Sequence, residues 1–553
     1  MEMVWNIFFM FGGVAAMMLG MKIMGGALEK VAGGGMKKML GKVTSNRFAG
    51  VGVGLAVTCV IQSSTATTVM LVGFVNIGLM TLAQATNVIM GANIGTTVTA
   101  HIVSLSEVAD VGAIAAMIGC GGVLTAMLVK NEKAINIGNI LGGLGLLFVG
   151  LEFISTYAKE IMFINGDKNN PAGWAMAIFQ GDHFPLLLVL IGIVITALVH
   201  SSSTITSLMV VLAGIGVLSF DNALFLALGS NIGTCITSIM SSAGTNVNAK
   251  RTALVHLMFN LFGCLLFLAP IWIWKEEVTW LFASMADNVG QQIAIFHTLF
   301  NVCATALLLP FTKYIVKLAC LLIKDNKEET EDKYKFAYLD TRMLETPAIA
   351  ASNVKREIIR MSNLSKDNIN YSLEMLLNTS VDNTAKIREN EDVINHLNKN
   401  IVGFLTRLMG KDLNEQDDKK IGSYYHVVSD VERVGDYAEN IMEYSQRLKA
   451  EESEMSDDAK KELTDLKERF NRLHDKTILA FDNRDLSVLP EVADIEETID
   501  ELSVELETRH IDRLRKGLCT AQIGSIFLQT VSNLERVSDH MTNVAFSIKQ
   551  YTK

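Results

Sequence analysis

The sequence contains few prolines and few cysteines for its length. Six prolines are spread over 553 residues, and the apolar stretches lack the regular turns and alternation of membrane barrel strands, which run about 10 residues each. Six of the seven cysteines are scattered in apolar segments without C-x-x-C spacing, which argues against disulfides and zinc sites. The sequence therefore predicts an all-α protein.

Charge is also scarce in the first part of the chain. Residues 1–323 hold 15 Lys/Arg and 13 Asp/Glu, whereas the other 230 residues hold 33 and 45. No charged side chain interrupts the 59 residues between Arg47 and Glu107 or the 38 between Asp182 and Asp221. Because a membrane helix needs about 20 apolar residues, residues 1–323 are predicted to form a polytopic membrane domain. The acidic second part has no basic stripe, so no nucleic-acid partner is expected.

Seven apolar segments are predicted to span the membrane. They are Val4–Gly25, Ala85–Ser104, Val111–Val129, Ala134–Ser155, Asn222–Met240, Leu254–Trp274 and Gln291–Leu322. The first lacks a basic leader, so we interpret it as a retained helix and not a cleaved signal. Basic loop residues then divide nine to three in favour of the cytoplasm. This places the amino terminus outside and the charged second part inside a cell (inner) membrane, whether or not the segments around Gln62 and His200 cross fully.

The membrane part contains an internal repeat. The stretches "GLAVTCVIQSSTATT" from Gly54 and "GIVITALVHSSSTIT" from Gly192 are 138 residues apart, and Gln62–Thr97 aligned with His200–Cys235 gives 12 identities in 36 positions. Chance similarity of apolar helices does not supply two blocks of polar and glycine residues at one spacing. We predict repeats over about 50–130 and 188–268, and the three spans between the two polar clusters invert the second repeat relative to the first.

The polar clusters indicate a binding site at membrane depth. Hydroxyls and amides there cost free energy unless they bind something, and irregular backbone is tolerated only beside protein or a water-filled cavity. Paired broken helices in inverted repeats build midplane sites, where half-helix amino termini face an anion and freed carbonyls coordinate a cation. The alternative is that Ser and Thr bond to their own backbone or tie helices together. Two clusters at symmetric positions favour the site.

These motifs resemble the sodium-phosphate cotransporter family, whose type II members carry a Q-S-S-S signature in both halves. Here "QSST" and "HSSS" are each followed 29 residues later by "GANIGTT" or "GSNIGTC". The resemblance, over about residues 50–310, implies a sodium-coupled symporter of inorganic phosphate with both signatures lining the substrate and sodium sites. The residues so implied are Gln62, Ser63, Ser64, Thr65, His200, Ser201, Ser202 and Ser203. Thr65 keeps the hydroxyl of the third serine, whereas His200 replaces an amide and opens a proton-dependent contribution.

Other polar and small residues at depth are interpreted separately. His256 and Asn260, like His297 and Asn301, are four apart and share a helix face, and we interpret both pairs as helix-to-helix hydrogen bonds. The glycines of the two G-[AS]-N-I-G-T segments are predicted packing residues: Gly91, Gly95, Gly229 and Gly233. The polar residues of these segments are candidate sodium ligands or supports of the site: Asn93, Thr96, Asn231 and Thr234.

The second part of the chain is a separate duplication. A charged linker, residues 324–340, is followed by long amphipathic stretches without strand signals. "SDVERVGDYAENI" from Ser429 and "SNLERVSDHMTNV" from Ser532 match at an offset of 103, and "ENEDVINHL" from Glu389 pairs with "DIEETIDEL" from Asp494 at an offset of 105. We predict a helical-bundle domain over 341–553, made of two three-helix units at about 346–450 and 453–549.

The duplicated E-R-V-x-D helices resemble the PhoU family of phosphate-signalling proteins. The resemblance implies that acidic and Asn side chains on these helices hold a multinuclear metal cluster. A spacing of four places three of them on one face of each helix: Glu432, Asp436 and Asn440, and Glu535, Asp539 and Asn543. Hard oxygen ligands suit Mg, Mn or Fe. The alternative is a solvated acidic face with Glu–Arg pairing.

The leading hypothesis is a sodium:phosphate symporter, and not an enzyme, with a cytoplasmic PhoU-like module that adjusts transport. Two alternatives stay open: a membrane-anchored phosphate-signalling receptor without transport, and a transporter of another oxyanion such as arsenate or a phosphonate. The duplicated cluster favours transport, because a mere anchor has no use for it. The expected partners are inorganic phosphate, sodium and the lipid bilayer, with a second copy of the chain or a cytoplasmic regulatory protein left open.

Overall fold

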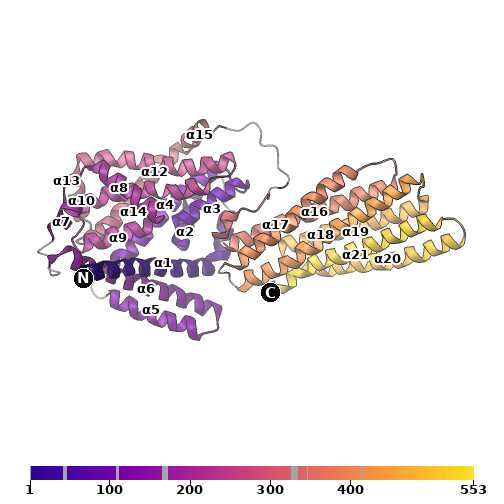
Figure 1. Cartoon of the computed structure of the whole chain (residues 1–553), viewed down its shortest axis with the longest axis horizontal. Helices are drawn as coiled ribbons and strands as arrows, with labels where there is room; N and C mark the ends of the chain where they lie inside the picture. The colour runs from indigo at the N-terminus through magenta and orange to yellow at the C-terminus, as the bar shows by residue number, and fades with distance from the viewer. Residues whose placement is uncertain are drawn as a thin grey trace. The chain divides into compact units, whose positions relative to one another are not determined.

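The computed structural model describes residues 2–41, 46–107, 111–164, 172–324, 334, 336–345, 347–411, 413 and 415–552. These residues form helices and turns and no β-strand, which confirms the predicted all-α fold. The chain divides into two compact units, Met1–Glu328 and Glu329–Lys553 (Figure 1). Most of the predicted linker, and the loop residues Lys42 and Lys168, lie outside the described residues.

The first unit is a stack of long and short helices. They are α1 (Glu2–Gly41), α2 (Arg47–Ile61), α3 (Ser64–Asn76), α4 (Leu82–Ser104), α5 (Val111–Leu128), α6 (Glu132–Met162), α7 (Gly173–Ala175), α8 (Pro185–Val199), α9 (Ser202–Gly214), α10 (Phe220–Gly233), α11 (Cys235–Ser241), α12 (Val247–Ile273), α13 (Lys275–Ala283), α14 (Val289–Leu308) and α15 (Thr312–Leu322). The order of lengths repeats: α2 and α8 have 15 residues each, and α3 and α9 have 13 each.

Several of these helices are long and apolar enough to cross a membrane. Five qualify singly: Glu2–Ala32, Glu132–Met162, Phe220–Ser241, Val247–Ile273 and Val289–Leu322. The pair Gly173–Gln180 and Pro185–Val199 qualifies together and is bent by 95°. The remaining two predicted spans fall in α4 and α5, which are helices but are not among the five. The reason is that α4 carries buried Asn and Thr side chains along its length and α5 is short.

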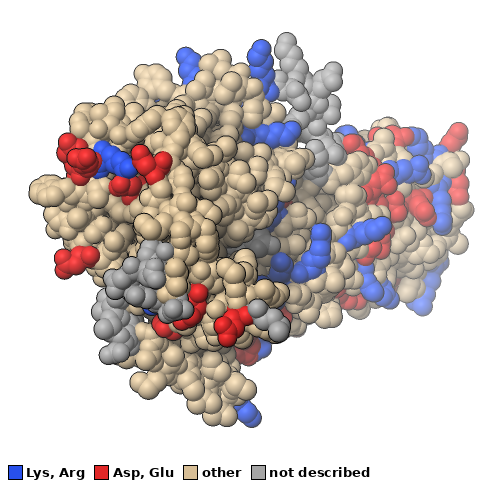
Figure 2. All heavy atoms as spheres, turned by 60° about the vertical axis from the view of Figure 1, so that its left-hand side comes forward, with Lys and Arg blue, Asp and Glu red and all other residues tan. Residues whose placement is uncertain are grey.

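The surface of the first unit suits a bilayer. The surface of this unit in Figure 2 is mostly tan, with a few small groups of charged side chains. Large apolar side chains are exposed on the outer helices, including Trp5 of α1, Met127 of α5 and Leu198 of α8. Since soluble proteins rarely expose apolar patches of this extent, this unit is a multi-pass membrane domain.

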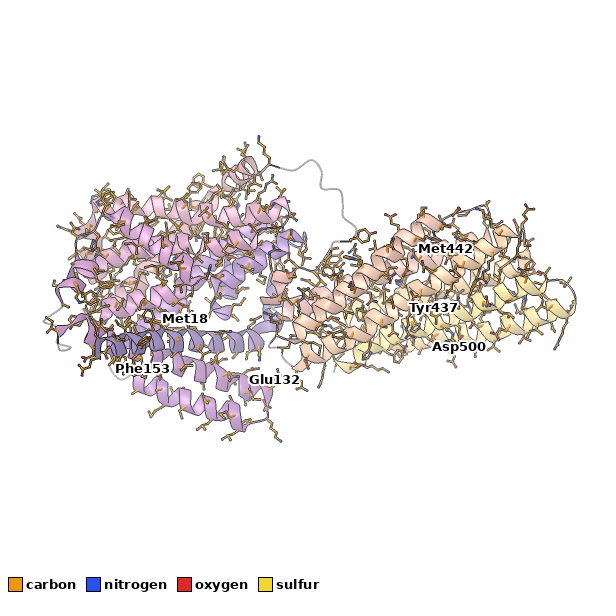
Figure 3. All side chains as sticks on the ribbon, viewed as in Figure 1. Met18, Glu132, Phe153, Tyr437, Met442 and Asp500 are labelled. Atoms are coloured by element: carbon orange, nitrogen blue, oxygen red, sulfur yellow. The ribbon has the colours of Figure 1, made fainter. Side chains whose placement is uncertain are left out.

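The second unit is a bundle of six helices in two sets of three. These are α16 (Pro347–Leu377), α17 (Thr384–Met409) and α18 (Glu415–Ala450), followed by α19 (Asp457–Asn483), α20 (Leu489–Arg515) and α21 (Ala521–Phe546). Met442 of α18 packs with Met375 and Ile387 in a small apolar cluster (Figure 3). The two sets meet where α18 packs on α21 and where α16 packs on α19. Between α16 and α19, the side-chain amides of Asn370 and Asn471 exchange hydrogen bonds of 2.9 and 3.0 Å.

Candidate functional site

Each polar cluster breaks a helix at the same position of the repeat. Gln62 ends α2 with φ 56° and ψ 23°, and His200 ends α8 with φ 57° and ψ 22°. This left-handed conformation costs a residue with a side chain about 1 kcal/mol or more, and such strain collects at functional sites. The backbone N–H of each residue still donates to the preceding helical turn, Gln62 to Thr58 O and His200 to Thr196 O. The backbone therefore reverses in the same way at both clusters.

A new helix starts directly after each break. Ser63 and Ser201 are the N-caps, and their hydroxyls accept hydrogen bonds from the amides of Ala66 and Thr204. Ser64 and Ser202 are the first helical residues and are each 4% exposed. The first N–H groups of a helix have no partner within it, and its positive dipole end favours an anion. Both half-helices thus offer buried hydroxyls and free amides at an electropositive end.

The last hydroxyl residue of each signature, Thr65 or Ser203, and the residue at each break, Gln62 or His200, differ between the repeats. Thr65 is half-buried and Ser203 is 9% exposed. The amide of Gln62 is fixed, because its Oε1 accepts from Thr99 Oγ1 at 3.0 Å and its Nε2 donates to Cys59 O. His200 is exposed and makes no side-chain hydrogen bond to any residue that the structure describes. The imidazole of His200 therefore does not replace the tether that the Gln62 amide provides.

The glycines of the G-x-N-I-G-T segments allow close helix contacts in both repeats. A Cβ on Gly91 of α4 would lie 1.9 Å from Val51 O of α2, and a Cβ on Gly229 of α10 would lie 2.0 Å from Val189 O of α8. A Cβ on Gly95 or Gly233 would also be too close, at 2.7 and 2.6 Å from a carbonyl oxygen of the facing helix. Since side chains do not approach backbone atoms this closely, the predicted packing role of these glycines is confirmed.

The Asn residues of these segments are bonded differently. Asn93 donates to Ile89 O of its own helix at 3.2 Å. Asn231 instead places Oδ1 3.3 Å from His297 Nε2 of α14, and its buried Nδ2 has no hydrogen-bond partner among the described residues. Thr96 and Thr234 both donate to their own helices, to Ala92 O and Ser230 O. Three of the four residues are therefore bonded to their own backbone, and Asn231 has a free donor.

The two H-x-x-F-N helices contact the second repeat. His256 Nδ1 of α12 lies 3.0 Å from Ser238 Oγ of α11, and Asn260 Nδ2 lies 3.2 Å from Cys235 Sγ. With the His297–Asn231 contact, these bonds confirm the predicted helix-to-helix role of His256, Asn260 and His297. Asn301 instead donates to His297 O of its own helix at 2.8 Å. The helix-to-helix bonds of the other three residues end on α10 and α11, which are separated at Thr234, whereas α4 runs without a break.

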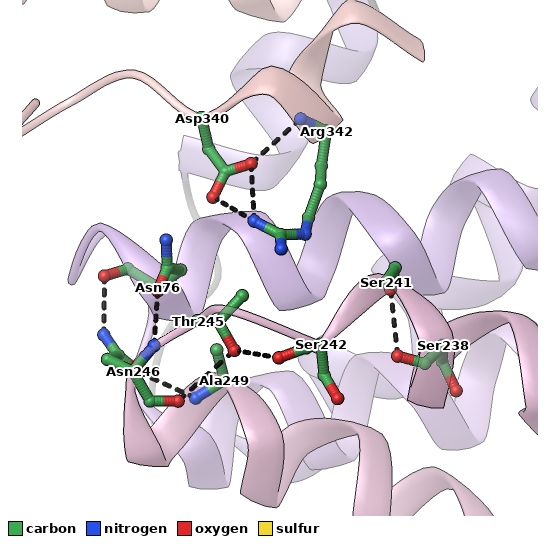
Figure 4. Close-up of polar contacts among 9 residues, drawn as sticks. All are labelled: Asn76, Ser238, Ser241, Ser242, Thr245, Asn246, Ala249, Asp340 and Arg342. Carbon is green, nitrogen blue, oxygen red and sulfur yellow. Dashed lines mark hydrogen bonds and ion pairs between the residues drawn. The ribbon is translucent and has the colours of Figure 1, made fainter.

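A further link fixes the far end of the first half-helix. Asn246, the N-cap of α12, donates from its backbone N–H to Asn76 Oδ1 at 2.9 Å and from its side-chain Nδ2 to Asn76 O at 2.6 Å (Figure 4). Asn76 is the last residue of α3. The half-helix that begins at Ser64 is thus tied to α12 at its carboxyl end.

The second unit holds an acidic cluster in each set of three helices. In the first, Glu391 of α17 faces Glu432, Asp436 and Glu439 of α18, and it is 4% exposed. Burial, and then the neighbouring carboxylates, raise the pKa of Glu391 to about 8. Burial also raises the pKa values of Glu432 and Asp436. Carboxylates held this close repel one another unless a proton or a cation intervenes.

The second acidic cluster is more compact. Ligand oxygens of Glu496 and Asp500 of α20 and Asp539 of α21 all lie within 4.8 Å of one another. Asp500 lies along the yellow half of the bundle in Figure 3. Burial raises the pKa of Glu535, with Asp539 the next cause, so this residue belongs to the same group. Four carboxylates from two helices therefore converge in each half of the bundle.

Two family models match this chain. The model described as Na+/Pi-cotransporter matches residues 16–156 and 178–316, and the PhoU domain model matches residues 358–445 and 463–548. The chain belongs to the Na+/Pi-cotransporter family. Its second unit is a PhoU domain.

Relatives match both the whole chain and its parts. A protein of Escherichia coli (strain K12) named "Putative inorganic phosphate export protein YjbB" is 25% identical over 97% of this chain and 96% of its own length. "Sodium-dependent phosphate transport protein 2C" of Rattus norvegicus is 35% identical over 28% of this chain and 25% of its own. The crystal structure of PhoU from Pseudomonas aeruginosa covers 35% of this chain and 93% of its own, at 21% identity and a TM-score of 0.34.

The structure brings together some of the residues singled out from sequence. The four residues of each signature, QSST and HSSS, surround a helix break. Glu432 and Asp436 lie within one acidic cluster, and Glu535 and Asp539 lie within the other. The two Asn residues predicted as metal ligands, Asn440 and Asn543, are not among the residues of these clusters. Asn440 is exposed, and Asn543 lines a separate cavity of about 290 Å³ with Asp430 and Ser423.

Sequence reasoning missed the carboxylates on α17 and α20. Glu391, Glu496 and Asp500 complete the two clusters. The signal was present, because Glu391 and Glu496 occupy equivalent places in the segments "ENEDVINHL" and "DIEETIDEL" that pair at an offset of 105. A repeated acidic position on the helix next to the E-R-V-x-D helix points to Glu391 and Glu496, whereas Asp500 aligns with Asn395 at that offset and carries no such signal.

Proposed function

We propose that this protein carries inorganic phosphate across the membrane together with sodium, at a site formed by the two helix breaks. One observation carries the proposal: the breaks at Gln62 and His200 have the same backbone geometry, and each is followed by a serine N-cap and a serine at the start of a new helix. A tetrahedral anion needs several converging donors. Two half-helix amino termini with the hydroxyls of Ser64 and Ser202 supply them in a way that a lone helix end does not.

Sodium would bind beside the phosphate. It prefers oxygen ligands, and the broken segments supply serine and threonine lone pairs and carbonyls. Among the described polar residues of the G-x-N-I-G-T segments, Asn231 has an unpartnered N–H donor, so we assign it to the phosphate. Thr96 and Thr234 donate their hydroxyl protons to their own helices and keep oxygen lone pairs that suit sodium. Coupling follows if each ion lowers the cost of desolvating the other.

The direction of net transport follows from the gradients. One relative is named for phosphate export and another for sodium-dependent phosphate transport. A coupled carrier runs either way, so both names fit one mechanism. A receptor without transport would have no need of two matched breaks, which favours transport over that alternative.

We also propose that the PhoU domain lies in the cytoplasm and adjusts transport. Its two acidic clusters each gather four carboxylates, the hard oxygen ligands that suit a divalent cation such as Mg, Mn or Fe, and three oxygens of the second cluster lie close enough together for one ion. Glu391, Glu432 and Asp436 would hold the metal in one half, and Glu496, Asp500 and Asp539 in the other. A bound cation would remove the repulsion within each cluster and rigidify the helices that carry it.

Labelled phosphate flux in proteoliposomes tests the proposal. The full-length protein is assayed with an inward, an outward or no sodium gradient, and with arsenate and methylphosphonate as competitors. We expect flux along the sodium gradient in both orientations, and its loss in a Ser64→Ala and Ser202→Ala double variant but not in Ser284→Ala, an exposed loop serine bonded to Leu281 O. Equal flux under all gradients would refute sodium coupling. No flux in a correctly folded protein would favour the receptor.

A further inference from the structure

Two buried histidines in the membrane domain each have one bare ring nitrogen. His256 is 0% exposed, and its Nδ1 lies 3.0 Å from Ser238 Oγ. The hydroxyl proton of Ser238 goes to Cys235 O at 2.8 Å, so Ser238 Oγ accepts and His256 Nδ1 donates. In neutral imidazole the other nitrogen is then an acceptor. That nitrogen, Nε2, has no partner among the described residues.

His297 shows the same arrangement with the nitrogens exchanged. It is 2% exposed, and its Nε2 lies 3.3 Å from the amide oxygen of Asn231. An amide oxygen only accepts, so Nε2 carries the proton and Nδ1 is the bare acceptor. Nδ1 is also without a partner among the described residues. Two lone pairs able to take a proton are thus buried on α12 and α14.

Among the described residues, no carboxylate contacts either of these nitrogens. The helices α3, α4, α9 and α11, which pack against α12 or α14, contain no Asp or Glu. Asp221 of α10 is engaged by Lys275 and Thr279, and the carboxylates of α13 are exposed. The titratable groups that face the pair are His101 of α4, whose Nε2 lies 2.8 Å from Thr298 Oγ1, and the thiol of Cys235.

The remaining titratable and charged groups on the surrounding helices are cations, thiols and one tyrosine. They are Lys250, Arg251 and Cys264 on α12, Cys303 on α14, Lys275 on α13, and Lys313, Tyr314, Lys317 and Cys320 on α15. None is an anion at neutral pH. A buried imidazolium without an anion is costly. A proton would therefore reside on His256 or His297 only when an anion enters from outside.

A free donor next to His297 indicates what that anion is. Asn231 Nδ2 is buried, 5% exposed as a residue, and lacks a partner among the described residues. It belongs to the same residue whose oxygen fixes His297. In addition, α14 packs against α9, whose first turn carries Ser202 and Ser203. An unpaired amide donor and a protonatable ring beside the half-helix suit an oxyanion.

We propose that His297 and His256 are proton-binding sites that take up a proton from solution when phosphate binds, with the phosphate as their counter-ion. This rests on the proposed phosphate site. The step balances as a binding equilibrium: one proton leaves water and joins a ring nitrogen, phosphate enters with its charge, and no bond within phosphate changes. Linkage then requires phosphate affinity to fall as pH rises, by about tenfold per pH unit for one linked proton.

Calorimetry of phosphate binding in two buffers tests the proposal. Titrations of the full-length protein with inorganic phosphate, in two buffers of different ionisation enthalpy, give the number of protons taken up. We compare the wild type with His256→Gln, His297→Gln and the double variant. His183→Gln is the control, because His183 lies outside the pair and contacts Ile178 O. Proton release or uptake by phosphate itself is common to all samples and cancels in the difference.

We expect the double variant to take up about one proton fewer per phosphate than the wild type, and His183→Gln to match the wild type. If a Gln variant misfolds, the corresponding Asn variant is used in its place. Proton uptake that stays equal in folded variants that bind phosphate would overturn this proposal and leave the transport proposal standing. A wild-type protein that binds no phosphate would instead overturn the proposed function itself.

Discussion

Glu391 gives the sharpest test of the acidic clusters. Its carboxylate is 4% exposed, and neither oxygen makes a hydrogen bond of good geometry to a described residue. Burial, then Glu439, Asp436 and Glu432, raise its pKa from 4.5 to about 8. The native protein thus holds a proton that the unfolded chain releases above pH 4.5. Stability from this group is fully present below the unfolded pKa and is lost as pH rises toward 8.

The size of the effect follows from linkage. With these two pKa values, the free energy of opening the α17–α18 region falls by about 2 kcal/mol between pH 6 and pH 8. Glu391→Gln keeps a neutral side chain of the same shape at every pH. We expect this variant to remove most of that decline and to be more protected than the wild type at pH 8. Asp392→Asn, a neighbouring exposed carboxylate, is the matched control.

Hydrogen exchange of the full-length protein measures the effect. Protection of α17 and α18 peptides is followed at pH 6 and pH 8 in chelator, corrected for intrinsic exchange rates. Added Mn²⁺ or Mg²⁺ should flatten the wild-type decline, because a cation takes the place of the proton, and should act less on Glu391→Gln. An undiminished decline in Glu391→Gln would show that its carboxylate is not the group that titrates.

Four further predictions concern the rest of the chain. Ser64→Ala and Ser202→Ala should each lower uptake at limiting phosphate, at a cost of about 1 to 3 kcal/mol in binding; normal uptake would remove that serine from the site. His200→Gln should flatten the pH dependence of apparent phosphate affinity, whereas an unchanged profile would assign that pH dependence to the ionisation of phosphate itself. Gly91→Ala should destabilise the membrane domain by about 1 to 3 kcal/mol, measured by thermal unfolding against the open position Gly52. Deleting residues 329–553 should leave sodium-dependent uptake but remove its control; an inactive, correctly inserted truncation would place the PhoU domain in the transport pathway.

The breaks were predictable because they are local. A hydroxyl cluster inside an apolar run has few low-energy arrangements: serine as an N-cap is among the most favourable, and Ser63 and Ser201 take that role. The same applies to the small residues, since Gly91 and Gly229 recur at a spacing that a helix contact explains. Local capping and packing rules therefore led from sequence to both half-helices.

The acidic clusters were only half predictable. A spacing of four identifies which residues share one helix face, so Glu432 with Asp436 followed from sequence. It does not say which residues of another helix meet that face. Glu391 reaches the cluster because α17 packs on α18 in one register, and that register is set by the buried apolar side chains along both helices. Partners between helices depend on packing that no single segment contains.

The difference between Asn93 and Asn231 could not be read from sequence at all. Both stand in G-x-N-I-G-T, yet one bonds to its own helix and the other to His297. The cause lies outside the G-x-N-I-G-T segments: α12 and α14 place His256 and His297 against α11 and α10. Two equivalent segments thus acquire different chemistry from unequal neighbours. The free donor of Asn231 therefore belongs to the second repeat, so an anion held between the two half-helices would meet an additional N–H group from that repeat.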